Sequence, residues 1–294
     1  MLLRRIIKCW SKMLSPLFLL RFMCHNTLVN PTPDLPSPPE ISLQVRSYYI
    51  RERNALVTQA EFSDLFVDYY LHLADLHVQQ DPEHDRIFKE TLAALTLHCA
   101  SKPWNETIAW TLSFQNPQLN IFVNGSNPLG TLIGRCFTEN IRPSEKNLFF
   151  ADIVRPNQLP HRSSIQFDGA DGFKAVEAYY KQSEQRPAHF FEVADEEYLF
   201  VSAQPDCDVA WLESLTLEQA QNLEQNEVFS LLEMRNYRWE CGCTHEKMMD
   251  ILAPTMRSDA GALFGGDAAL RMTCPRCGKR YAITRESMEA LIKK

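Results

Sequence analysis

Four cysteines in two closely spaced pairs constrain the fold of this 294-residue chain more than any other feature. The first pair is Cys241-Gly-Cys243, and the second, thirty residues further on, is Cys274-Pro-Arg-Cys277. Four thiolates form the soft tetrahedral ligand set that zinc prefers. We therefore predict a zinc site, with Zn²⁺ held by Cys241, Cys243, Cys274 and Cys277.

The segment that carries these cysteines depends on such a site in order to fold. Residues 237–294 hold few large apolar side chains, and domains this small commonly use a metal in place of a large core. Pro275 and Gly278 are expected to tighten the turn of the second pair, with Tyr281 packed beneath it. A Cys-x-Cys pair is also a dithiol that an oxidant can close. The chemistry of these residues is therefore compatible with both a structural zinc ribbon and a redox switch.

The beginning of the chain differs in composition from the rest. Residues 1–30 carry five Lys or Arg and no acidic residue, and residues 31–40, PTPDLPSPPE, contain five prolines. The prolines predict a stiff, extended spacer. No apolar run reaches the length of a membrane-spanning helix, so no membrane partner is expected. We interpret residues 1–40 as a basic extension and spacer, either unstructured or an amphipathic surface anchor.

Residues 41–204 have the pattern of an α+β body, a mostly antiparallel sheet with packed helices. Apolar residues at helical spacing begin at Phe62, and Asp81-Pro82 predicts the start of a second helix with Phe88, Leu92, Leu95 and Cys99 buried. Strict alternation on both sides of Asn116-Pro117 predicts a hairpin. Further strands are expected at 148–154, 162–167, 188–194 and 197–203, with a helix at 172–184 between the second and third of them.

Residues 205–236 are predicted to form a helical, metastable linker between the body and the zinc domain, 237–294. Thr216 and Gln219 have the spacing of a capping box at the start of a short helix. Val228, Leu231, Leu232 and Met234 suggest a second short helix with an apolar stripe. Because helices this short are not stable alone, the linker must lie on another part of the protein.

The net charge and the remaining cysteines indicate the cellular compartment and the kinds of partner to expect. The net charge is −7, but the two ends are basic, so residues 31–270 carry −17 and would repel nucleic acid. Nine cysteines, five of them scattered, fit a reducing compartment, and we expect a cytoplasmic protein. Cys99 and Cys136 are expected to be inert core thiols, Cys207 an oxidisable linker thiol without a neighbour, and His245 a surface residue.

Together the cysteine pairs resemble the heat-shock protein 33 family of redox-regulated holdase chaperones, which carry Cys-x-Cys and then Cys-x-x-Cys near the C-terminus. The resemblance extends from about Arg46 to the end and is most specific in the last 120 residues. The agreeing flanks are Thr244-His245-Glu246-Lys247, Arg271-Met-Thr before Cys274, Tyr281, Ile283, Asn226-Glu227-Val228 and Tyr180-Lys-Gln-Ser183-Glu184-Gln185-Arg-Pro187.

The resemblance implies an ATP-independent holdase chaperone without catalytic residues. The reduced, zinc-bound protein would be an inactive monomer. Under oxidative stress, disulfides Cys241–Cys243 and Cys274–Cys277 would form, zinc would leave, and the linker would detach. The exposed apolar surface would then bind unfolding client proteins, and the active form would be a homodimer.

Three departures from the family pattern bear on the efficiency of this switch. The stretch between Val228 and Cys241 is shorter than is usual, Gly125-Ser-Asn-Pro128 replaces a Gly-Asp-Gly-Pro turn, and residues 1–40 are additional. Alternative functions are a zinc-ribbon nucleic-acid-binding protein, supported by the basic residues around Cys277, and a constitutive chaperone with a purely structural zinc. A thiol oxidoreductase is a further alternative, but its CxxC normally opens a helix.

Overall fold

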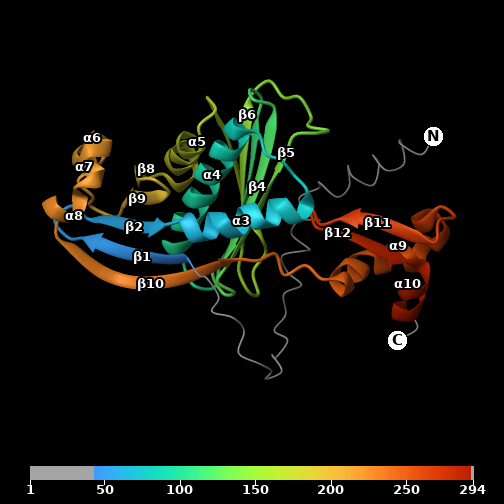
Figure 1. Ribbon diagram of the computed structural model, residues 1–294. Helices are drawn as coiled ribbons and strands as arrows, with labels where there is room; N and C mark the ends of the chain where they lie inside the picture. Colours follow the sequence, from blue (N-terminus) through green and yellow to red (C-terminus); the bar gives the residue numbers. More distant parts are fainter. Residues whose placement is uncertain (1–42, 293–294) are drawn as a thin grey trace. The chain divides into compact units, whose positions relative to one another are not determined.

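The computed structural model describes residues 43–292, which divide into two compact units between Trp239 and Glu240. The fold is α+β, as predicted (Figure 1). Our prediction for residues 1–40 lies outside the described residues. Within those residues, no helix is long and apolar enough to cross a membrane.

The first unit contains a ten-stranded sheet with strand order β7-β6-β3-β4-β5-β10-β1-β2-β9-β8. All neighbouring strands are antiparallel except β10 and β5, which pair in parallel through Arg238 and Trp239. The strands are β1 Leu43–Ile50, β2 Ala55–Glu61, β3 Thr107–Phe114, β4 Leu119–Ser126, β5 Thr131–Phe137, β6 Asn147–Val154, β7 His161–Phe167, β8 Ala188–Ala194, β9 Glu197–Ala203 and β10 Phe229–Trp239.

The predicted hairpin is confirmed as β3 and β4, and the four further predicted strands are β6, β7, β8 and β9. In β3 the alternation buries Ile108, Trp110, Leu112 and Phe114 completely, which directs one face of the hairpin into the core. Our expected boundaries for these four strands differ from the observed ones by no more than one residue.

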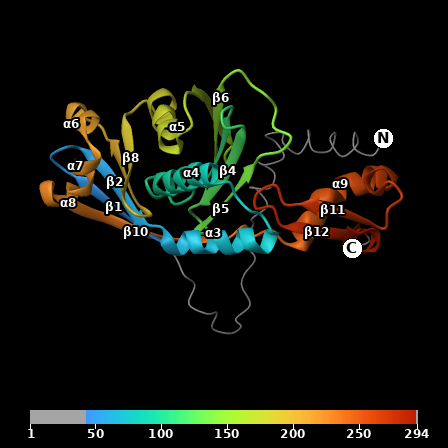
Figure 2. The same ribbon diagram turned by 45° about the horizontal axis from the view of Figure 1, so that its top comes forward.

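Three helices cover one face of the sheet: α3 Ser63–Leu76, α4 Pro82–Ala100 and α5 Gly172–Tyr179, the last extended by a π-helical turn, Tyr180–Glu184 (Figure 2). The predicted start of α4 is confirmed, because Asp81 accepts hydrogen bonds from the backbone N–H groups of Glu83 and His84. The stripe of α4 that ends at Cys99 is fully buried in the main core.

Three short helices lie on the opposite face of the sheet: α6 Val209–Ser214, α7 Leu217–Gln221 and α8 Leu223–Asn226. Successive side chains of β9 point to opposite faces of the sheet. Phe200 belongs to the main core, whereas Leu199 and Val201 pack with these three helices. Leu212 and Leu223 are almost fully buried in that second cluster. Packing against the sheet therefore stabilises the α6–α8 segment, as expected for helices too short to be stable alone.

Arg53, in the turn between β1 and β2, holds both ends of the α6–α8 segment. Its guanidinium pairs with Asp208, the N-cap of α6, at 2.8 Å and with Glu227, directly after α8, at 2.9 Å. It also lies 5.3 Å from the centre of the Trp211 ring in α6. The two carboxylates raise the pKa of Arg53, with Glu227 contributing most. A single side chain thus joins the segment to the turn at two points.

We expect Arg53→Met to speed amide hydrogen exchange severalfold in residues 209–226 of the reduced chain, with little change in β3 and β4. Methionine keeps a long, unbranched side chain but loses the guanidinium over the Trp211 ring and both ion pairs. The ion pairs are partly exposed and therefore modest in strength. Arg51→Met, an exposed position in the same turn, is the matched control. Exchange that is equal in both variants would show that Arg53 does not fasten the segment.

The predicted second linker helix is wrong, because residues 229–239 form β10, between β1 and β5. Leu231 faces Tyr48 and Glu233 faces Ser47, so Leu232 is an extra residue at a β-bulge. The bulge interrupts the period of two and gives the apolar residues a helix-like spacing. These residues are not buried either: Leu231, Leu232 and Met234 are each more than half exposed.

The second unit, residues 240–294, has a small core of its own. It contains α9 His245–Phe264, a hairpin of β11 Ala269–Thr273 and β12 Arg280–Thr284, and α10 Arg285–Ile292. Pro254 lies inside α9, and the helix is kinked at Asp259. The buried apolar side chains are Met248, Ala253, Met256, Phe264, Tyr281, Ile283 and Met288.

Candidate metal centre

The four cysteines that the sequence singled out come from two turns of the second unit. Cys241 and Cys243 lie directly before α9, whose N-cap is Thr244, and Cys274 and Cys277 lie in the turn between β11 and β12. Left-handed glycines shape both turns, with φ of 63° at Gly242 and 85° at Gly278. Glycine adopts this conformation at no steric cost, which explains why each pair includes or precedes a glycine.

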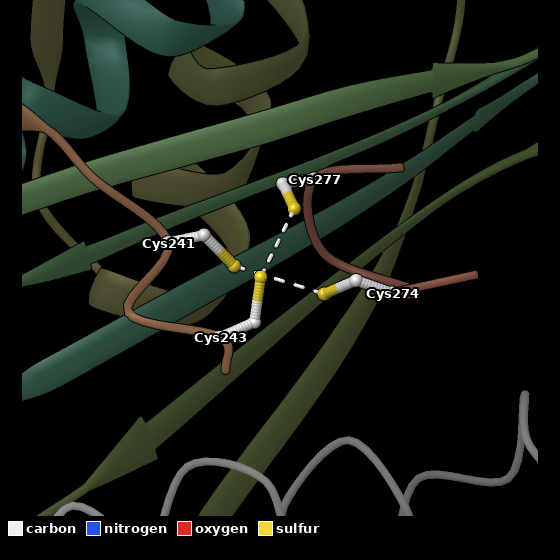
Figure 3. A group of neighbouring side chains, drawn as sticks. All are labelled: Cys241, Cys243, Cys274 and Cys277. Carbon is white, nitrogen blue, oxygen red and sulfur yellow. Dashed lines mark hydrogen bonds between the residues drawn. The ribbon is translucent and has the colours of Figure 1, made fainter. Parts of the chain in front are cut away.

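All four sulfur atoms lie within 4.8 Å of one another, so the structure brings together every predicted ligand (Figure 3). The Sγ atoms of Cys241 and Cys274 are 3.7 Å apart, and those of Cys243 and Cys277 are 3.5 Å apart. Tetrahedral zinc with Zn–S bonds of about 2.3 Å places its sulfurs roughly 3.8 Å apart. A disulfide would require only about 2.05 Å. The spacing thus suits four ligands of one ion.

Hydrogen bonds within the unit hold both turns. In the second turn, the N–H of Gly278 donates to the carbonyl of Cys274 at 2.9 Å, and the N–H of Cys274 donates to the carbonyl of Lys279 at 2.8 Å. In the first turn, Lys247 Nζ donates to the carbonyl of Gly242 at 2.7 Å. Arg276, only 6% exposed, donates to the carbonyl of Cys241 at 3.3 Å and so joins the two turns.

Tyr281 makes a direct contact with one of the sulfurs. Its hydroxyl lies 3.0 Å from Cys243 Sγ and 3.0 Å from the carbonyl oxygen of the same residue. Burial raises the pKa of Tyr281, as does its hydrogen bond to Cys243, so the phenol stays protonated and acts as the donor. The expected packing of Tyr281 at the turn is thus accompanied by a polar contact that the sequence did not indicate.

The four thiols differ in their pKa values: those of Cys243 and Cys274 are lowered, whereas those of Cys241 and Cys277 are raised. The pKa of Cys243 is lowered, chiefly because the Cys241 thiol hydrogen-bonds to its sulfur, and the pKa of Cys241 is raised for the complementary reason. The position before the N-terminus of α9 also favours a thiolate at Cys243. A cation at the centre offsets this charge, so the donor set fits a soft divalent metal.

The other candidate residues lie apart from this centre. His245 Nε2 donates to the carbonyl of Ala282 at 3.2 Å, and His245 is not one of the four clustered ligands. Cys99 is fully buried, and burial raises its pKa, as it does at Cys136. Both thiols are therefore poor nucleophiles, as predicted. Cys207 is half-buried beside α6, and burial raises its pKa as well.

The region around the cysteine cluster is similar to a known protein family. Residues 201–284 match the family model described as Hsp33 protein, and this range includes all four cysteines. This part of the chain is thus similar to the Hsp33 family. No curated protein matches the sequence significantly. Its fold is similar to the crystal structure of the 33 kDa chaperonin, a heat shock protein 33 homologue, from Thermotoga maritima.

The structural similarity extends over most of both proteins. The TM-score is 0.64, with 85% of this chain and 98% of the Thermotoga maritima chain covered, at 11% sequence identity. At this low identity the likeness concerns the fold. The described residues therefore combine an Hsp33-like fold, a match to the Hsp33 family model over residues 201–284 and a cysteine cluster that could bind a metal ion.

Proposed function

We propose that the chain is an ATP-independent holdase chaperone, activated when a zinc site of four cysteines is oxidised. The observation that carries this proposal is the cluster of Cys241, Cys243, Cys274 and Cys277, with sulfurs within 4.8 Å of one another in a region similar to the Hsp33 family. Bound zinc would neutralise thiolate charge and hold the two turns together. The protein has no catalytic role in this account and acts in the cytoplasm.

Activation begins at the two thiol pairs. An oxidant such as peroxide or hypochlorite removes two electrons from each pair and leaves the disulfides Cys241–Cys243 and Cys274–Cys277. Disulfide sulfurs are poor zinc ligands, so the ion is released and residues 240–292 lose most of their stability. The small buried core of this unit supports such dependence, because no more than seven apolar side chains other than cysteine are buried within its described part.

The linker responds next in the proposed sequence. The α6–α8 segment is connected to the zinc unit through β10, and its three helices are too short to be stable away from the sheet. Its release would uncover an apolar sheet face that includes Ile50, Val57, Leu199 and Val201. Unfolding client proteins would bind that face through apolar contacts. The active form would be a homodimer and the reduced form a monomer.

One contact removes Arg276 from the basic residues on which the nucleic-acid alternative rests. Arg276, the basic residue inside the second cysteine pair, is 6% exposed and donates to the carbonyl of Cys241. Its guanidinium is therefore directed into the metal centre, where it balances thiolate charge, and a phosphate group could not reach it without rearrangement.

Zinc content and client protection, followed together during peroxide treatment, test the proposal. We expect the reduced chain to hold about one zinc and to leave a heat-unfolded client unprotected. Oxidation should release the zinc in step with the loss of four thiols, and light scattering should then show that the client no longer aggregates. Equal protection by both forms would instead indicate a constitutive chaperone, and retained zinc would indicate a structural site.

A further inference from the structure

The four sulfurs of the metal centre differ in burial and in their hydrogen bonds. Cys274 and Cys277 are buried, with exposures of 0% and 2%, whereas Cys241 and Cys243 are partly open to solvent. Within the more exposed pair, Cys241 and Cys243, the Tyr281 hydroxyl contacts Cys243, at 3.0 Å from its Sγ atom. Among these thiols, Cys243 thus combines access for a small oxidant with a donor fixed against its sulfur.

The position of the Tyr281 hydroxyl is set by secondary structure. Tyr281 lies in β12 and pairs with Met272 of β11, and its side chain is only 9% exposed. Lys279 Nζ lies 5.9 Å from the centre of the ring. The second contact of the hydroxyl, 3.0 Å from the Cys243 carbonyl oxygen, holds it at the first turn. Because the Tyr281 hydroxyl is already fixed beside Cys243, its hydrogen bond to the thiolate costs no further loss of side-chain freedom.

A hydrogen bond at this sulfur opposes the first step of its oxidation by hydrogen peroxide. The Cys243 thiolate attacks one peroxide oxygen, the O–O bond breaks, and a sulfenic acid and hydroxide form. The Cys241 thiolate then attacks that sulfur, which gives the disulfide and a second hydroxide. The sulfurs lose two electrons and the peroxide gains two. A hydrogen-bond donor to the Cys243 thiolate withdraws electron density from the sulfur lone pair that attacks the peroxide. The hydrogen bond therefore lowers the nucleophilicity of this sulfur.

We propose that Tyr281 is a positioning residue that sets the resistance of Cys243 to peroxide. Its hydroxyl holds the thiolate in the geometry of a ligand and slows its attack on the oxidant. This inference rests on the proposed function, because it concerns the rate at which the same site is oxidised. It assigns to the tyrosine beyond the second cysteine pair a chemical role in addition to packing.

Tyr281→Phe tests the inference, because it removes one oxygen atom and keeps the ring. We expect this variant to bind one zinc and to release it to a colorimetric chelator about 10-fold faster than wild type in the same peroxide concentration. With Co²⁺ in place of zinc, its thiolate-to-metal charge-transfer band should shift. His245→Ala is the matched control: it alters a neighbour of the first pair that contacts the Ala282 carbonyl, and both readouts should stay at wild-type values.

A second substitution decides the matter if Tyr281→Phe does not fold. Incorporation of 3-fluorotyrosine at position 281 keeps the ring and strengthens the donor, so zinc release should become slower. Equal release rates and equal cobalt spectra in wild type and variant would overturn the inference while leaving the proposed function intact. Wild-type protein that keeps its zinc in peroxide would contradict the proposed function itself.

Discussion

Replacing Cys274 with Ser is expected to unfold residues 240–292 while the ten-stranded sheet remains intact. The Cys274 side chain is fully buried among the other three thiols, and serine is a weak zinc ligand. Apparent zinc binding contributes about 10–16 kcal/mol of folding free energy in small zinc domains, which exceeds what the core of this unit could replace. Hydrogen exchange measured by mass spectrometry on the full chain, together with zinc content, checks the prediction.

Cys207→Ser is the control for this experiment, because Cys207 is a half-buried thiol outside the metal centre. It should leave zinc content and the exchange of both units unchanged. If the Cys274→Ser chain lost zinc but kept slow exchange in α9, β11 and β12, the fold of the second unit would not depend on the metal.

Replacing Leu212 with Ala is expected to release the α6–α8 segment while zinc stays bound. Leu212 is fully buried between α6 and the sheet, and a Leu-to-Ala change at such a site costs about 2–5 kcal/mol. Helices of six, five and four residues have little stability to lose. The reduced variant should therefore show fast exchange in residues 209–226 and should protect a heat-unfolded client without oxidant.

Leu217→Ala provides the comparison for the linker, because Leu217 in α7 is 48% exposed and its loss creates no buried cavity. Exchange in β3 and β4 reports whether the main core of the Leu212 variant is still folded. A Leu212→Ala chain with a detached segment and no client protection would place the client-binding surface elsewhere.

Much of the body could be predicted from sequence where one side of each element is buried and the pattern is regular. Strand β3 alternates without interruption, and the stripe of α4 follows an aspartate N-cap and a first-turn proline. Strand β5 gave no such signal because Gly134 stands at its centre. A Cβ there would lie 2.9 Å from the Phe88 ring, so close packing of α4 requires the glycine that weakens the strand pattern.

Strand β10 could not be predicted for a different reason. Its bulge at Leu232 shifts the alternation by one residue, and its apolar side chains face outward, so neither periodicity nor burial indicates a strand. Pairing with β1, nearly two hundred residues earlier in the chain, determines its conformation. Long-range pairing of this kind overrides local preference.

The cysteine cluster was predictable because each pair of ligands lies within one short motif, and the motif alone brings the two thiols together. Tyr281 and Arg53 act across longer distances in the sequence. The bond from Tyr281 to Cys243 depends on the register of β11 and β12, and the ion pairs of Arg53 depend on how α6–α8 lie on the sheet. For neither Tyr281 nor Arg53 does the sequence contain a motif whose spacing would identify the residue that it contacts.

We propose that loss of the metal from the second unit releases the α6–α8 segment from the sheet of the first. The decisive experiment is hydrogen exchange of the full wild-type chain, compared between the reduced zinc-bound form and the peroxide-oxidised form. We expect peptides from residues 209–226 and from residues 240–292 both to lose protection, while β3, β4 and α4 keep theirs. Continued protection of residues 209–226 after zinc has left would contradict it.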